Sequence, residues 1–317
     1  MLGAIIGDIV GSIYEFDNIN TKNFEFFQDN MGLTDDSVMT LAVARALMDT
    51  LETGNESGFK NLSREISEEK LKFIRNKFNA DDLNPKTELE ANAILRMVEI
   101  GNKYPYMSYG TRFRYWLEDP VPYNSFGNGS AMRVSPVAYV ANNLEEVKFL
   151  SNEVTKVSHN HEEGIKGAEA TAVAIFMARN KCSKEEIKAE MEKYYSLDFN
   201  YEDLVRNYDF DETCQGTVPE AIYIFLESKD FEDAIRTAIS IGGDSDTLAA
   251  IVGSIAEAYY GVPEELAKKA LGSRGATRSS EQEPRKGRVH IAVSWCLPLQ
   301  LYQLVAHRWC LVLPQYG

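Results

Sequence analysis

The chain has 317 residues, of which 44% are hydrophobic and 26% charged, proportions typical of soluble globular proteins rather than disordered or membrane proteins. This length is sufficient for one large helical domain or two small ones, either with a substantial core, and we favour one large domain. The formal net charge of −15 argues against binding nucleic acid through its backbone, because that mode requires a basic surface.

The amino-terminal segment MLGAIIGDIVGS is apolar but lacks the features of a targeting signal. No basic region precedes it, and Asp8 interrupts its apolar stretch. No unbroken run of about 18 apolar residues follows, so we predict a cytoplasmic protein with no membrane partner. The cysteines lack both CxxC spacing and a dense framework, which favours reduced thiols: Cys182, Cys214, Cys296 and Cys310.

Residues 1 to about 271 show the hydrophobic periodicity of successive amphipathic helices, with short connections and no convincing alternating strand pattern. We therefore predict an all-α fold in one domain over residues 1–271. In the first segment, Gly3, Gly7 and Gly11 are spaced four apart. In a helix they would form a smooth ridge on which another backbone can pack closely, a structural role that is sufficient to explain them.

Two later segments are predicted to be core helices, because apolar residues recur at steps of three and four over residues 38–51 and 248–259. Other helix starts are marked by residues suited to a first turn or a capping box: Asn143 with Glu146, Ser183 with Glu186, and Pro219.

The character of the chain changes at about residue 272. A polar, breaker-rich stretch is followed by a segment rich in tryptophan and histidine. Residues 272–317 carry six Lys or Arg against two Glu, a net charge of +4, which leaves −19 for the remainder. We interpret residues 272–317 as a linker with an appended segment, in the manner of a frameshift or cloning product, and assign it no function.

Two acidic clusters each open one of the predicted core helices, LTDD at residues 33–36 and GGDSDT at residues 242–247. Free amides at a helix start orient carboxylates and hydroxyls, so two such ends brought together would gather several hard oxygen ligands. The alternative is that each cluster is only an N-cap. Capping uses one side chain per helix, whereas each cluster offers several oxygen-bearing residues.

Carboxylates packed together repel one another unless a cation neutralises them. Ligands made of oxygen alone, with no Cys or His nearby, favour Mg²⁺ or Mn²⁺ over zinc. Four carboxylates would be sufficient for two ions roughly 4 Å apart, which can lower the pKa of a bound water to about 7 and hold substrate hydroxyls. The sequence thus favours hydrolysis of a polar ligand.

The histidines of the segment SHNHEE, His159 and His161, have a spacing known from zinc sites. No further His or Cys cluster lies in the main domain, so lining of a ligand pocket or capping of the following helix is favoured. A Ser/His/Asp triad stays open, although no GxSxG nucleophile elbow is present.

The segment YNSFGNGSAMR at residues 123–133 is rich in small and amide side chains. Small residues let backbone amides approach an anion, and Arg133 could form a bidentate contact with phosphate. The alternative is an ordinary Asn/Gly turn.

In this order, the segments resemble the ADP-ribosylglycohydrolase family, which includes dinitrogenase reductase-activating glycohydrolase and the animal ADP-ribosyl-acceptor hydrolases. The resemblance runs from residue 3 to about 266, and the first and last acidic segments together make it specific. The segments that carry it are GAIIGDIVGSIYEF, LTDDSVMT, FGNGSAMRVSPVA, SHNHEEGIKGAEA, CQGTVPEAI and IGGDSDTLAAIVG.

The resemblance implies a compact orthogonal multi-helix bundle with a binuclear Mg²⁺ or Mn²⁺ centre. It implies a metal-dependent hydrolase that releases ADP-ribose from a modified protein side chain or a small adduct, through an oxocarbenium-like state. The metal ligands implied by motif match are Thr34, Asp35, Asp36, Asp244, Asp246 and Thr247.

The catalytic residues implied are Asp35 or Asp36 as base toward water, and Glu15, which matches a glutamate lying over the metal site in some members. Substrate contacts to the diphosphate, the ribose and the distal part of the ligand would come from Asn128, Gly129, Ser130, Met132, Arg133 and His159. The sequence departs from the family pattern at Glu162, where proline is common, and after residue 271, where the atypical tail replaces a closing helix.

Two other function classes stay open, a non-catalytic ADP-ribose-binding protein and a two-metal phosphoesterase that would release AMP. The complete acidic set argues against a binder, because recognising ADP-ribose requires no metal centre. Serine, arginine and small 1″-linked adducts are all open as leaving groups, and the oligomeric state is open too.

Overall fold

The computed structural model describes residues 1–53 and 58–272. All regular structure in these residues is helical, apart from two isolated bridges, Glu65 with Thr87 and Gly127 with Thr213. The all-α prediction is confirmed. None of the helices in the described ranges is both long and apolar enough to cross a membrane.

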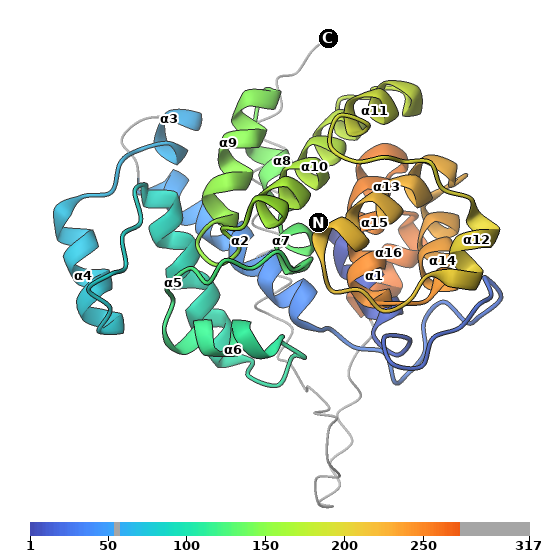
Figure 1. Ribbon diagram of the computed structural model, residues 1–317, viewed down its shortest axis with the longest axis horizontal. Helices are drawn as coiled ribbons and strands as arrows, with labels where there is room; N and C mark the ends of the chain where they lie inside the picture. The colour runs from blue at the N-terminus through green and yellow to red at the C-terminus, as the bar shows by residue number, and fades with distance from the viewer. Residues whose placement is uncertain (54–57, 273–317) are drawn as a thin grey trace, which may run out of the picture. The chain divides into compact units, whose positions relative to one another are not determined.

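Figure 1 labels most of the helices. In chain order they are α1 (Leu2–Gly11), α2 (Asp35–Glu52), α3 (Phe59–Leu62), α4 (Glu68–Phe78), α5 (Glu88–Lys103), α6 (Thr111–Glu118), α7 (Gly129–Met132), α8 (Val137–Val140), α9 (Leu144–Thr155), α10 (Glu162–Arg179), α11 (Lys184–Met191), α12 (Tyr201–Asn207), the 3₁₀ helix η1 (Cys214–Gly216), α13 (Val218–Glu227), α14 (Phe231–Ile241), α15 (Ser245–Tyr260) and α16 (Glu264–Gly272).

Contacts divide the chain into a unit Met1–Val262, which holds every candidate site residue, and a second unit that begins at Pro263. Helix α16 is the described part of that second unit. The atypical tail predicted over residues 272–317 lies outside the described residues from residue 273 onward.

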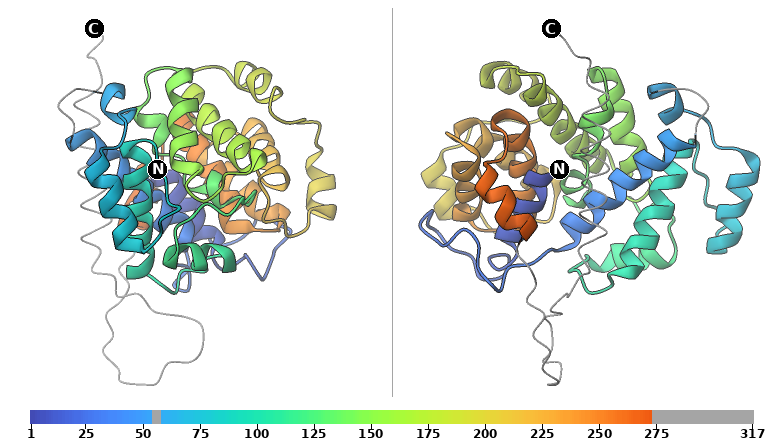
Figure 2. Two further views of the ribbon diagram at one scale, coloured as in Figure 1. Left: turned by 60° about the vertical axis from the view of Figure 1, so that its left-hand side comes forward. Right: turned by 180° about the vertical axis from the view of Figure 1, so that it is seen from behind.

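The two predicted core helices are α2 and α15. Their apolar stripes are buried, except that the last members, Leu51 and Tyr259, are partly exposed. Helix α2 packs along α5 (Figure 2), and α15 packs against α1, α13 and α14. The predicted helix starts are also found: Ser183 and Glu186 form a capping box, the Asn143 side chain accepts from the Glu146 amide, and Pro219 lies in the first turn of α13.

Helix α1 makes its closest approach to α15 along the predicted glycine ridge. A Cβ atom placed on Gly3 would lie 2.1 Å from the Gly253 carbonyl oxygen, and one on Gly7 would lie 2.0 Å from that of Ala249. At Gly11 it would lie 2.3 Å from the Cα atom of Asp246. The glycines therefore bring the end of α1 directly against the start of α15.

We predict that Gly7→Ala lowers the free energy of unfolding by about 1–3 kcal/mol, because its methyl group must push two backbones apart. Alanine has the higher helix propensity, so the loss would come from packing. Chemical denaturation measures it. The control is Gly32→Ala, where no atom lies within 4 Å of the new methyl group; equal stability of the two variants would contradict the prediction.

Candidate active site

The starts of α2 and α15 meet, as the sequence analysis expected. Thr34 caps α2, and its Oγ1 accepts a hydrogen bond from the Asp36 amide at 3.4 Å. From the start of α15, Thr247 Oγ1 donates to Asp36 Oδ2 at 3.3 Å. The two acidic segments thus share one buried volume.

Two glycines set the approach to Asp244. Gly242 and Gly243 have φ angles of 81° and 71°, in the left-handed region that favours glycine. A Cβ on Gly243 would lie 2.3 Å from the Tyr208 ring, so this position also lacks room for a side chain. The glycine pair of the GGDSDT segment is therefore required by the turn into α15.

The carboxylates of this volume form two overlapping groups. One oxygen each from Asp8, Asp36 and Asp246 lie within 4.8 Å of one another, and the same holds for Glu15, Asp244 and Asp246. Asp36 and Asp246 are each only 3% exposed. The Asp36 Oδ1 atom is buried without a hydrogen-bond partner, and Asp35, beside it in the sequence, is partly exposed.

The electrostatics of these groups fit a cation. Burial and repulsion from neighbouring carboxylates hold the pKa of Asp36 and of Asp246 well above its usual range. Burial, followed by the charge of Asp244, raises the pKa of Glu15 to about 7. So many carboxylates cannot all ionise in one buried volume unless positive charge balances them, and an oxygen-only set suits a hard divalent cation. The donor set and the unpartnered Asp36 oxygen both fit such an ion.

Asp8 on α1 is the site residue that the sequence analysis missed. It is fully buried, and its carboxylate accepts from Thr34 Oγ1 at 2.7 Å, from the Thr34 amide at 3.0 Å and from the Ser37 amide at 3.1 Å. Burial raises its pKa to about 6 although these hydrogen bonds lower it. The available signal was an aspartate in a helix whose other residues are apolar or glycine, since a buried charge needs specific partners.

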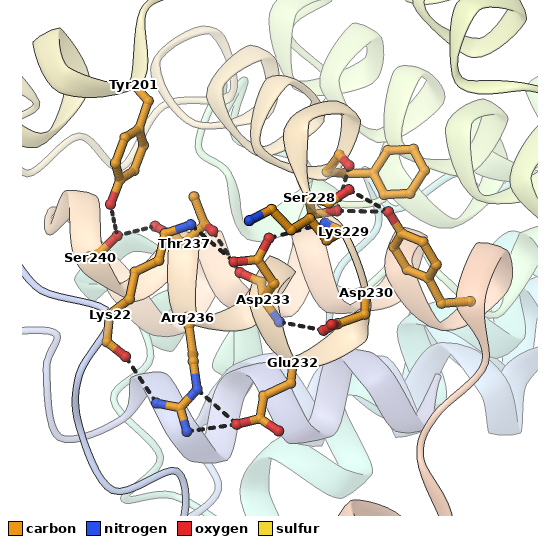
Figure 3. A network of polar contacts seen from close by, with 12 residues as sticks. Lys22, Tyr201, Ser228, Lys229, Asp230, Glu232, Asp233, Arg236, Thr237 and Ser240 are labelled. Atoms are coloured by element: carbon orange, nitrogen blue, oxygen red, sulfur yellow. Dashed lines mark hydrogen bonds and ion pairs between the residues drawn. The ribbon is translucent and has the colours of Figure 1, made fainter.

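Glu15 lies just beyond α1, on a segment held against the start of α15. The Asn18 side chain bonds both polar groups of the Gly243 backbone, donating to its carbonyl at 2.9 Å and accepting from its amide at 3.0 Å. Farther along, Arg236 donates to the Lys22 carbonyl at 3.0 Å (Figure 3) and to the Phe24 carbonyl at 2.7 Å. These contacts fix the connection between α1 and α2 on α14 and on the turn that follows α14.

The segment at residues 123–133 includes the short helix α7, and it is hydrogen-bonded to one of the carboxylates. Asn128 Nδ2 donates to Asp244 Oδ2 at 2.7 Å and to Thr217 Oγ1 at 3.1 Å. Ser130 Oγ donates to the Gly164 carbonyl at 2.8 Å. The Asn128 and Ser130 side chains therefore hold the loop in place beside the acidic groups.

Three further residues predicted to contact substrate, Met132, Arg133 and His159, are also buried. Arg133 is 1% exposed, donates to Ser158 Oγ at 2.7 Å and lies over the Phe113 ring. Burial and the charge of Arg133 lower the pKa of His159 well below its usual range, which keeps that imidazole neutral. Met132 is 5% exposed, with its sulfur 4.0 Å from Thr247 Oγ1. Their contacts to a ligand stay predictions.

Gly129 is the first residue of α7 and packs against the His159 ring. A Cβ atom placed on Gly129 would lie 3.3 Å from His159 Nε2. His161 takes the capping role, since its Nδ1 accepts from the Glu163 amide at 3.1 Å at the start of α10. The two histidines therefore have different surroundings: His159 lies against α7, and His161 caps α10.

A family model described as ADP-ribosylglycohydrolase matches residues 1–284. An uncharacterised protein of Archaeoglobus fulgidus is 32% identical over 43% of this chain, and the match spans half of that protein. The ADP-ribosylarginine hydrolase Tri1 of Pseudomonas putida is 24% identical, and the match covers 89% of this chain and 76% of the Tri1 chain. For the ADP-ribosylhydrolase ARH3 of Mus musculus the identity is 25%, with 86% of each chain covered.

Among solved structures, an ADP-ribosylglycohydrolase-related protein complex aligns with a TM-score of 0.50 at 21% identity, over 86% of this chain and 95% of that one. This likeness supports the fold. Because the family model spans most of the sequence, the chain belongs to the ADP-ribosylglycohydrolase family of enzymes.

Proposed function

We propose that the protein hydrolyses an ADP-ribosyl linkage with the help of two divalent cations, Mg²⁺ or Mn²⁺. The observation that carries the proposal is the meeting of the two carboxylate groups, buried except for the partly exposed Glu15, at the starts of α2 and α15 beside the loop at residues 123–133. The family membership supports the reaction type, and two relatives are named for hydrolysis of ADP-ribosyl groups.

The cations would be held by the six predicted ligands at the two helix starts, which Asp8 positions through its hydrogen bonds from Thr34 and Ser37. When bound, they would supply positive charge that holds ribose hydroxyls and lowers the pKa of a water molecule. The six ligands are Thr34, Asp35, Asp36, Asp244, Asp246 and Thr247.

The chain's own groups would then bind the nucleotide and move a proton. Residues 128–133 would line the diphosphate and ribose, and the Asn128 bridge to Asp244 would fix the distance between diphosphate and carboxylates. Asp35 is partly exposed and therefore the accessible candidate to accept a proton from the attacking water. Glu15 is partly exposed beside Asp244 and Asp246, and it is the candidate to hold a proton and donate it to the leaving group.

Asp246 belongs to both carboxylate groups, so its removal should be the most damaging single change. We predict that Asp246→Ala lowers kcat/KM by roughly a hundredfold or more, because even residues that only support metal ligands cost about 10- to 100-fold. Mass spectrometry of products from serine-linked, arginine-linked and 1″-phosphate ADP-ribose substrates, each with Mg²⁺, measures it.

The matched control is Asp81→Ala, at an exposed aspartate of the turn before α5. Release of intact ADP-ribose by wild type and Asp81→Ala, but not by Asp246→Ala, is the expected result. Release of AMP would instead assign a phosphoesterase, and binding without turnover of any substrate would assign a non-catalytic ADP-ribose-binding protein.

Asp8 should matter for cation affinity through the ligands that it positions. We predict that Asp8→Asn weakens Mn²⁺ binding by about 10- to 100-fold, measured by calorimetry or by the spin-resonance signal of free Mn²⁺. The metal-free variant should unfold at the same or a higher temperature, because one buried carboxyl is removed. Unchanged Mn²⁺ affinity in a folded Asp8→Asn variant would contradict the proposal that Asp8 positions the cation ligands.

A further inference from the structure

Two exposed phenylalanines stack on each other next to the carboxylate groups. Phe16 is 82% exposed and Phe210 is 43% exposed, and their ring centroids lie 5.9 Å apart at an interplanar angle of 23°. Single exposed apolar side chains are common on proteins, but a stacked pair offers water a continuous apolar surface and suits a partner.

The pair spans two segments that border the candidate active site. Phe16 directly follows Glu15 in the sequence. The Glu15 carboxylate lies close to those of Asp244 and Asp246. Phe210 lies in the connection between α12 and η1, where the Glu212 carbonyl accepts from the Asn128 amide at 2.8 Å. The charge of Glu212 is also close enough to raise the pKa of Glu15. The rings therefore lie at the rim of the site.

Both segments are held in position. Asn18 fixes the Phe16 segment to Gly243, and Asn20 Nδ2 donates across to the Val205 carbonyl at 2.5 Å. Tyr208 packs its ring on Gly243 and donates from its hydroxyl to the Gly216 carbonyl at 2.8 Å. The two rings thus stand on anchored backbone, so little ordering would be needed when a ligand binds them.

The surroundings of the pair are acidic. Residues 12–18 and 208–213 contain no Lys or Arg, and Asp17, Asp209 and Glu212 are exposed one or two residues from the rings in the sequence. Aromatic faces attract cationic side chains, arginine above all because its planar guanidinium stacks on rings. Carboxylates around such a face add attraction for the same charge.

We propose that Phe16 and Phe210 bind an arginine side chain that neighbours the modified residue in a protein substrate. The proposal rests on the proposed function. The carboxylate groups and residues 127–133 would take the ADP-ribose, and the acceptor protein would lie across the rim beside Glu15 and Phe16. The pair would then select protein substrates whose modified residue is flanked by arginine.

The test compares three substrates: two ADP-ribosylated peptides with the same linkage, flanked either by arginines or by glutamines, and ADP-ribose 1″-phosphate. Wild type should prefer the arginine-flanked peptide by about tenfold in kcat/KM, and the preference should shrink at high salt. The double variant Phe16→Ser with Phe210→Ser should lose the preference and keep its rate on the other two substrates.

Phe73→Ser is the matched control, because Phe73 is 56% exposed and lies on α4, outside the two segments that carry the stacked rings. It should retain the full preference. Two results would overturn the proposed arginine binding by Phe16 and Phe210 and leave the proposed function intact. These are equal rates of wild type on the two peptides, or an equal loss of rate by the double variant on all three substrates.

Cleavage of none of the three substrates would count against the proposed function itself. Arginine binding by the Phe16–Phe210 pair is then tested by measuring the affinities of the two peptides, carrying a fluorescent label, by fluorescence anisotropy. Tighter binding of the arginine-flanked peptide, lost in the double variant, would support it, and equal affinities would overturn it.

Discussion

The close contact of α1 with α15 is the constraint on which the rest of the site depends. Gly3, Gly7 and Gly11 leave no side chain between the two helices. Asp8, on the same helix, can therefore reach the start of α2, while the end of α1 delivers Glu15 to the start of α15. Two helix starts far apart in the sequence become neighbours, and their caps become a single cluster of oxygen atoms.

That arrangement has an electrostatic cost that a cation would offset. The raised pKa values of Glu15, Asp36 and Asp246 have the same origin, burial of carboxyl groups that repel one another. Hydrogen bonds from Thr34, Thr247 and Asn128 orient the oxygens without supplying positive charge. The carboxylates are therefore oriented by hydrogen bonds while their charge is left unbalanced, an arrangement that fits the proposed cation site.

The sequence predicted what local chemistry determines. Thr34 and the glycines before Asp244 reflect helix capping and turn geometry, and the ridge on α1 follows from spacing alone. Asp8 was missed because its partners, Thr34 and Ser37, come from another helix. Likewise, the burial of Arg133 and the stacking of Phe16 on Phe210 depend on tertiary packing, which no periodicity in the sequence records.

The most direct test of the central claim is a crystal structure of the protein with Mn²⁺, with the ions located by their anomalous scattering. The account predicts two peaks among the carboxylates of Asp36, Asp244 and Asp246, at the junction of α2 with α15. Peaks only elsewhere on the acidic surface, together with full hydrolytic activity in EDTA, would contradict it.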